Sequence, residues 1–116
     1  MVRMKLFKFI LVFLFLDYSL FSKPTLDGNF DYTNVLLKDQ ITFLEINGEL
    51  LNLSGKDFNV SYFKLNFYDS SGRLLTTGKI SITGFKKNQK RSFQCFLDYQ
   101  KVSEISNFTI DFESSD

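Results

Sequence analysis

Apolar and polar residues alternate along most of the chain after residue 30, which is the pattern of β-strands with one buried face. The segment 59–69 shows the alternation most clearly, because Ser61, Phe63, Leu65 and Phe67 share one phase. The other phase mixes polar, charged and aromatic side chains. We therefore predict a strand whose Phe/Leu/Phe face points into the core.

The segment 41–54 has the same period, with Leu44, Ile46, Gly48 and Leu50 on one face. A glycine inside a strand has no side chain to pack, so Gly48 predicts a bulge, a bend or a close backbone approach. The leucines that follow fall on the opposite phase, which is consistent with a bulge nearby.

Three further segments extend the pattern toward the C-terminus. We predict one or two strands over 73–85, interrupted near Gly78, and single strands over 92–99 and 105–112. The residues predicted to face the core in the last two are Phe93, Cys95, Leu97, Tyr99, Phe108, Ile110 and Phe112.

About seven short strands separated by turn signals, with no amphipathic helix after residue 22, are typical of an all-β, immunoglobulin-like antiparallel β-sandwich. A small closed barrel is the alternative. The length of 116 residues favours one domain. We assign the sandwich to residues 41–113, preceded over 23–40 by an extended leader that holds an edge strand at 30–37.

The first 22 residues differ from the rest of the chain. A basic start is followed by an uncharged apolar run over 9–16 and a more polar stretch over 17–22, which is the order of a secretory signal peptide. The apolar run is shorter than the roughly 20 residues that span a bilayer. We predict cleavage between Ser22 and Lys23, and the alternative is an uncleaved membrane anchor. The expected location is therefore the periplasm, the cell surface or the exterior.

Charge gives no sign of a nucleic-acid partner. The chain has 14 basic and 13 acidic residues, a net charge of +1. Removal of residues 1–22 leaves 14 − 3 = 11 basic and 13 − 1 = 12 acidic residues, a net charge of −1. A dedicated nucleic-acid binder usually has a strongly basic surface.

Catalytic and metal chemistry have few candidates. No histidine is present, which excludes histidine-based triads and most zinc sites. The lone Cys95 shares a phase with Phe93 and Leu97, so we expect an inert buried thiol. We predict no catalytic residues, no metal and no cofactor, and hence no enzyme.

The segment 27–38 begins like a calcium-binding loop, with Asp27, Asn29 and Asp31 at alternate positions. Tyr32 and Lys38 stand where such a loop requires Gly and Glu, so we do not assign a calcium site.

One cluster of like charge stands out. Lys86, Lys87, Lys90 and Arg91 lie within six residues. They are candidates for contact with an anionic lipid or surface polymer, and the alternative is a solvated turn.

Two segments, 48–55 and 65–75, carry a recognisable motif. Its residues are Gly48, Leu50, Asn52, Ser54, Leu65, Phe67, Tyr68, Asp69 and Gly72. The pattern resembles the FxLYD domain family, although Leu65 and Phe67 exchange the family's aromatic residue and leucine. The resemblance implies a β-sandwich of exported prokaryotic proteins with no catalytic residues and no settled ligand.

The motif residues also suit structural roles. We expect Asp69 to accept hydrogen bonds from turn amides, with Gly72 free to adopt positive φ. Tyr68 supplies a broad side chain with a polar tip. Asn52, if buried, would satisfy backbone groups near a bend.

We expect a non-enzymatic exported β-sandwich that acts through protein–protein contacts. The alternative is a binding module for anionic lipid or polymer through the basic loop 86–91. Residues 1–22 would add membrane contact if they are not cleaved.

Overall fold

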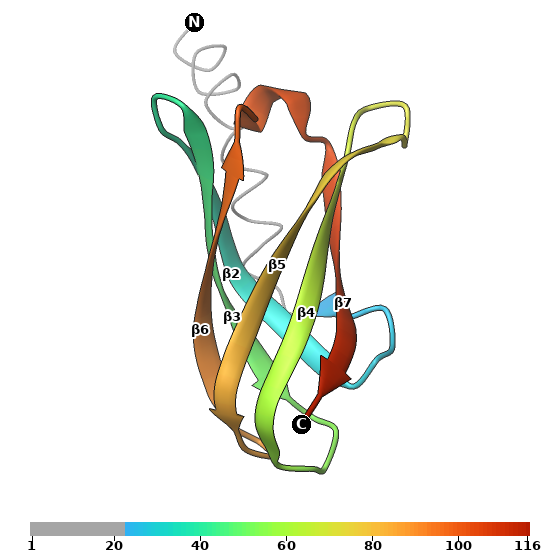
Figure 1. The fold of residues 1–116 in the computed structure, drawn as a ribbon. Coiled ribbons are helices and arrows are strands. Elements are labelled where there is room, and N and C mark those ends of the chain that lie inside the picture. Colours follow the sequence, from blue (N-terminus) through green and yellow to red (C-terminus); the bar gives the residue numbers. More distant parts are fainter. Residues whose placement is uncertain (1–22) are drawn as a thin grey trace, which may run out of the picture.

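The structure, a computed structural model, describes residues 23–116, which form two antiparallel sheets (Figure 1). The elements are β1 (Lys23–Pro24), β2 (Phe30–Asp39), β3 (Phe43–Asn52), β4 (Phe58–Tyr68), β5 (Leu74–Phe85), β6 (Lys90–Asp98), the 3-10 helix η1 (Val102–Glu104) and β7 (Asn107–Ser115). Sheet A has the order β1-β2-β3-β6, and sheet B has the order β5-β4-β7. The prediction of an all-β sandwich is confirmed, and the closed barrel is not the architecture. The predicted signal segment, 1–22, lies outside the described residues.

The core lies between the facing sides of the two sheets. Ser61, Phe63, Leu65 and Phe67 of β4 are fully buried, as their shared phase predicted. At one end of the core, the Phe30 ring of β2 meets the Phe63 ring edge-on at 4.9 Å between centroids. Aromatic contacts of this kind add to the stabilisation that burial itself gives.

At Gly48 the side chain of Phe93 lies against the backbone of β3, so of the three predicted meanings the close approach to the backbone is the one observed. A Cβ at this position would lie 2.7 Å from Cζ of Phe93. The pairing of β3 with β6 continues through Gly48 without a shift, so β3 has no bulge there. The irregularity lies in the neighbouring strand β2, between Thr33 and Leu36.

β5 is one continuous strand, so the predicted interruption near Gly78 does not occur. Gly78 instead makes room for β6, because a Cβ there would lie 2.5 Å from Sγ of Cys95. The guanidinium of Arg91 on β6 donates to the carbonyl oxygen of Thr83 on β5 at 2.7 Å. The edge strands of the two sheets are thus joined along this side.

The segment expected as an extended leader is part of the sandwich. Lys23 pairs with Tyr32, and the amide of Leu26 donates to the carbonyl oxygen of Ile110 on β7 at 3.0 Å. The side chain of Phe30, at the start of β2, is only 1% exposed. The leader therefore connects β2 of sheet A with β7 of sheet B, on the side opposite the β5–β6 contact.

The connections gather at two opposite ends of the sandwich (Figure 1). The hairpin end, at the top of the figure, comprises loops 40–42, 69–73 and 99–106. The basic end, at the bottom, comprises loops 53–57 and 86–89, and loop 25–29 lies near it at the side of the sandwich, beside β7.

The prediction that Tyr99 faces the core is wrong. β6 ends at Asp98, and Tyr99 follows it with a φ of 60° and an exposed fraction of 83%. The left-handed backbone breaks the alternation, so the side chain leaves the phase of Leu97.

No helix among residues 23–116 is long and apolar enough to cross a membrane.

Candidate functional site

Asn52 fastens two loops at the basic end. Its side chain is fully buried, and Nδ2 donates to the carbonyl oxygens of Lys56 at 2.8 Å and Phe85 at 3.3 Å. Its Oδ1 accepts from the amide of Ser54 at 3.0 Å and from the hydroxyl at 2.6 Å. The backbone of Asn52 also donates to the carbonyl oxygen of Gln89 at 3.0 Å. Asn52 is therefore committed to the scaffold.

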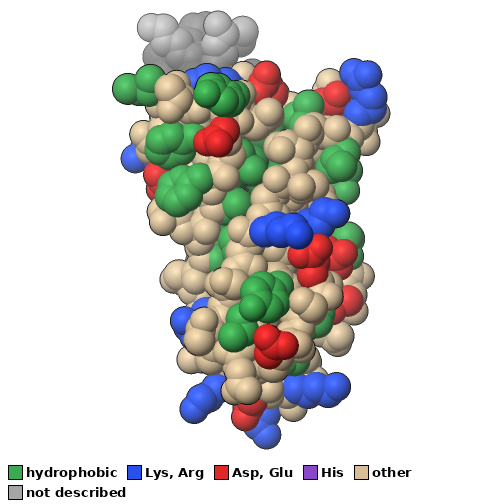
Figure 2. Space-filling model, viewed as in Figure 1, with side chains coloured by type: hydrophobic (Ala, Val, Ile, Leu, Met, Phe, Trp, Pro, Cys, Tyr) green, Lys and Arg blue, Asp and Glu red, His purple; other side chains and the backbone are tan. Residues whose placement is uncertain are grey.

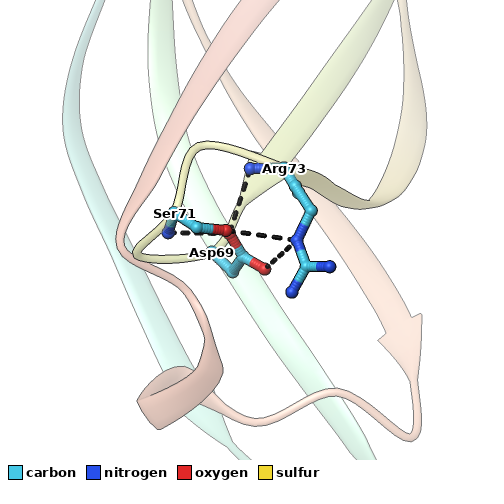
Figure 3. Close-up of polar contacts among 3 residues, drawn as sticks. All are labelled: Asp69, Ser71 and Arg73. Carbon is cyan, nitrogen blue, oxygen red and sulfur yellow. Dashed lines mark hydrogen bonds and ion pairs between the residues drawn. The ribbon is translucent and has the colours of Figure 1, made fainter.

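Asp69 stabilises a loop at the hairpin end, the turn between β4 and β5 (Figure 3). Its Oδ1 accepts from the backbone amides of Ser71 at 2.9 Å and Arg73 at 3.0 Å. Its Oδ2 lies 3.4 Å from Nε of Arg73. Hydrogen bonds from Ser71 and from the Arg73 amide lower the pKa of Asp69 from its ordinary 3.8 to about 2.

The remaining motif residues also belong to the scaffold. Leu65 and Phe67 are fully buried, and Gly72 completes the Asp69 turn with a φ of 85°. Tyr68 is half-buried, and its carbonyl oxygen accepts from the amide of Ser106 at 2.8 Å. Together with Gly48 and Asn52, these residues build the fold.

The basic cluster divides into two parts. Lys86, Lys87 and Lys90 are exposed at the basic end, and Figure 2 shows basic side chains gathered at this end of the molecule. Arg91 is half-buried, and its guanidinium bonds the carbonyl oxygens of Thr83 at 2.7 Å and Gly84 at 3.3 Å. Three lysines are thus available to an anionic partner, whereas Arg91 links the two sheets.

The outer face of sheet A carries a group that the sequence did not single out. Phe43 on β3 and Phe96 on β6 lie outside the core, with their rings edge-to-face at 5.5 Å between centroids. Phe96 is 53% exposed. The sequence placed Phe96 opposite the core face, but only the register of β3 with β6 brings Phe43 beside it.

Polar side chains adjoin this aromatic pair on the same face. Asn47 donates to Oε2 of Glu45 at 2.7 Å, and Gln94 donates to Oδ1 of Asn47 at 3.0 Å. The Asn47 bond is the main cause that lowers the pKa of Glu45. We call Phe43, Phe96, Glu45, Asn47 and Gln94 the sheet A face.

Cysteine and acidic side chains are the remaining candidates for metal or thiol chemistry. Among residues 23–116, no group of three or more Cys, Asp or Glu residues could hold a metal ion. Cys95 is buried, and burial raises the pKa of its thiol, which disfavours the reactive thiolate. Asp27, from the calcium-like segment, instead accepts hydrogen bonds from Thr25 and Asn29.

No protein-family model and no curated protein sequence matches the chain. Two solved structures are similar to it. One is a DUF1425 family member from Shewanella sp. pv-4, with a TM-score of 0.45 and 16% identity, covering 73% of this chain and 77% of that one. The other is IrmA from Escherichia coli, with a TM-score of 0.47 and 22% identity, covering 71% of this chain and 73% of that one.

Proposed function

We propose that this chain is a non-enzymatic, exported β-sandwich of the FxLYD kind that acts through protein–protein contacts in the cell envelope or outside the cell. The order of charges and apolar residues in 1–22 supports export. The motif residues support the FxLYD assignment, because Asn52 and Asp69 fasten loops at opposite ends of the sandwich.

The observation that carries the proposal is the sheet A face. Exposed aromatic side chains are enriched at protein interfaces, where they contribute much of the binding energy. The rings of Phe43 and Phe96 pack edge-to-face, and the mutually hydrogen-bonded side chains of Glu45, Asn47 and Gln94 form a polar border beside them. A flat face of this composition suits a protein partner.

The test is site-specific photocrosslinking of the full chain in its native host. A photoreactive phenylalanine at Phe96 should capture a discrete protein, and Phe43→Ala should reduce that capture. The same probe at Tyr62, which is 39% exposed on the outer face of sheet B, is the matched control. Equal labelling at both positions, or no discrete product from Phe96, would contradict the proposal.

Export has its own measurement. The intact mass of the protein in soluble and membrane fractions should reveal a soluble species that begins near Lys23. A full-length species confined to membranes would make residues 1–22 an anchor instead.

The alternative function is binding of an anionic lipid or polymer by the basic loop. It draws support from the exposure of Lys86, Lys87 and Lys90. The mature protein, without the basic and apolar segment 1–22, should then bind anionic vesicles in a salt-sensitive manner. Binding that survives replacement of these three lysines and Arg91 by Gln would rule out this function.

A further inference from the structure

The hairpin end brings two very exposed apolar side chains together from separate loops. Ile41 is 92% exposed and Tyr99 is 83% exposed. Their loops are joined because the amide of Tyr99 donates to the carbonyl oxygen of Thr42 at 3.0 Å. The ammonium of Lys101 reaches the same place, where it donates to the carbonyl oxygens of Gln40 at 3.3 Å and Ile41 at 3.5 Å.

The fold does not require these side chains. Ile41 lies between β2 and β3, and Tyr99 follows β6, so neither contributes to a strand or to the core. Tyr99 also has a φ of 60°, which is an uncommon and strained conformation for a residue other than Gly, Asn or Asp. Because the strained conformation of Tyr99 brings no packing of its side chain, we infer that this side chain has a role other than stabilising the fold.

The three side chains match the composition that proteins use at the surface of a bilayer. Tyrosine places its ring at the level of the lipid headgroups, with its hydroxyl toward water. A lysine can rest its stem on apolar surface while its ammonium meets water or phosphate. An aliphatic side chain at a protruding turn can enter the boundary of the acyl chains.

The direction of β1 also favours the hairpin end as the end nearer the membrane. β1 is antiparallel to β2, and β2 runs toward the hairpin end, so the chain reaches Lys23 from the hairpin side. Between Leu16, the last residue of the apolar run, and Lys23 there are 23 − 16 = 7 residue steps, which extend to about 24 Å at most. From Tyr32, the partner of Lys23, to Asp39 there are also 39 − 32 = 7 steps, roughly 23 Å of strand. The linker is thus long enough for the apolar run to end level with the hairpin end.

We propose that, in the anchored form of the chain that keeps residues 1–22, the hairpin end is a membrane-contacting tip, in which Ile41 and Tyr99 enter the interface of the bilayer. The occupant of this apolar tip is a lipid surface. The proposal concerns a surface distinct from the sheet A face, and it does not depend on that face binding a protein.

The position of the basic loop follows from this orientation. β3 runs from the hairpin end to the basic end over ten residues, which is roughly 30 Å. With the hairpin end on the bilayer, Lys86 and Lys87 point away from that bilayer. The tip and the basic loop therefore cannot contact the same lipid surface at the same time.

The experiment uses the full chain reconstituted in vesicles of phosphatidylcholine and phosphatidylglycerol. Ile41→Cys and Tyr99→Cys are each labelled with a polarity-sensitive fluorophore, and lipids carrying a nitroxide quencher are then added. Leu53→Cys is the matched control, because Leu53 is a 47% exposed apolar residue at the basic end. The native Cys95 is buried and should label little in the folded protein.

The expected result is a blue shift and loss of fluorescence at positions 41 and 99 in vesicles, with neither change at position 53. Quenching at position 53 instead would reverse the orientation and overturn the proposal. No quenching at any position would also overturn it, since the tip would then lie in water. A blue shift at position 41 that grows with protein concentration in the absence of lipid would assign the tip to a second copy of the chain. Crosslinking from Phe96 is read separately, so failure of either proposal is distinguishable from failure of the other.

Discussion

Replacement of Gly78 by Ala should destabilise the protein by closing the space that β5 leaves for β6. The new Cβ would lie 2.5 Å from Sγ of Cys95 and 3.1 Å from Cδ2 of Leu97. Overpacking of a well-packed core typically costs about 1–3 kcal/mol. We expect about 2 kcal/mol here, because Sγ of Cys95 also lies 3.9 Å from the carbonyl oxygen of Lys79 on β5. For a domain of this size, the melting temperature should fall by roughly 10 °C.

The partner substitution makes the reasoning specific. Cys95→Ala alone should cost about 1 kcal/mol, because it leaves a small cavity. In the double variant, the methyl group at position 78 occupies space that the sulfur has vacated. The free energy lost should therefore be smaller than the sum of the two single losses by at least about 1 kcal/mol.

The measurement is guanidinium unfolding followed by far-UV circular dichroism. The free energies of unfolding are compared between variants that share the same m-value, the slope against denaturant concentration. Ser81→Ala, at an exposed position of the same strand, is the control and should change stability by less than about 0.5 kcal/mol. Strictly additive losses in the double variant would refute the packing at the β5–β6 edge.

Three further predictions concern other parts of the structure. Asn52→Ala should lower the free energy of unfolding by about 3 kcal/mol, since it leaves buried loop groups without partners, whereas Asn47→Ala on the outer face should cost less than about 1 kcal/mol in the same unfolding assay. Asp69→Ala should lower the melting temperature most above pH 3.8, because the pKa of Asp69 is lowered to about 2 and its stabilising effect is lost as pH falls through that value. A difference that stays constant from pH 5 to about 2 would contradict this cause. Tyr99→Gly should leave stability equal or raise it by about 0.5–1 kcal/mol, because glycine adopts the positive φ without strain; a clear loss of stability would mean that the Tyr99 side chain supports the fold.

The alternation of apolar and polar residues predicted burial well in strands that are paired with a neighbouring strand on both sides. Phe63, Leu65 and Phe67 are buried because β4 is the central strand of sheet B and is paired on both sides. Leu44 and Ile46 are buried for the same reason in β3. Local alternation is enough at such positions, since a shift of one residue would expose the whole apolar set.

The misplacement of Tyr99 shows where this reasoning ends. The alternation continues in the sequence through Tyr99, but the strand stops at Asp98. The left-handed backbone of Tyr99 ends it, in a turn held against Thr42, which is 99 − 42 = 57 residues away in the sequence and accepts from the Tyr99 amide. A tertiary contact of this range leaves no local pattern to read.

The candidate site was less predictable than the fold. Four basic residues close in sequence suggested one cluster, but β6 packs beside β5 of the other sheet, and the bond from the Arg91 guanidinium to the carbonyl oxygen of Thr83 takes Arg91 out of the cluster. The aromatic pair Phe43 and Phe96 was hidden for the opposite reason, since its members are 96 − 43 = 53 residues apart. A contact between strands becomes visible only when the register is known.

The residues of the sequence motif over 48–72 serve the scaffold. Asn52 and Asp69 have their polar atoms engaged by neighbouring loops, and Leu65 and Phe67 are buried. Proteins that share this motif would therefore share a scaffold without sharing a partner. Specific function must instead depend on side chains that the scaffold can lose, such as Phe96, and these can differ between proteins of the same fold without a cost in stability. Substitutions at Phe96 that abolish crosslinking while leaving the unfolding transition unchanged would show that partner binding and stability depend on different residues.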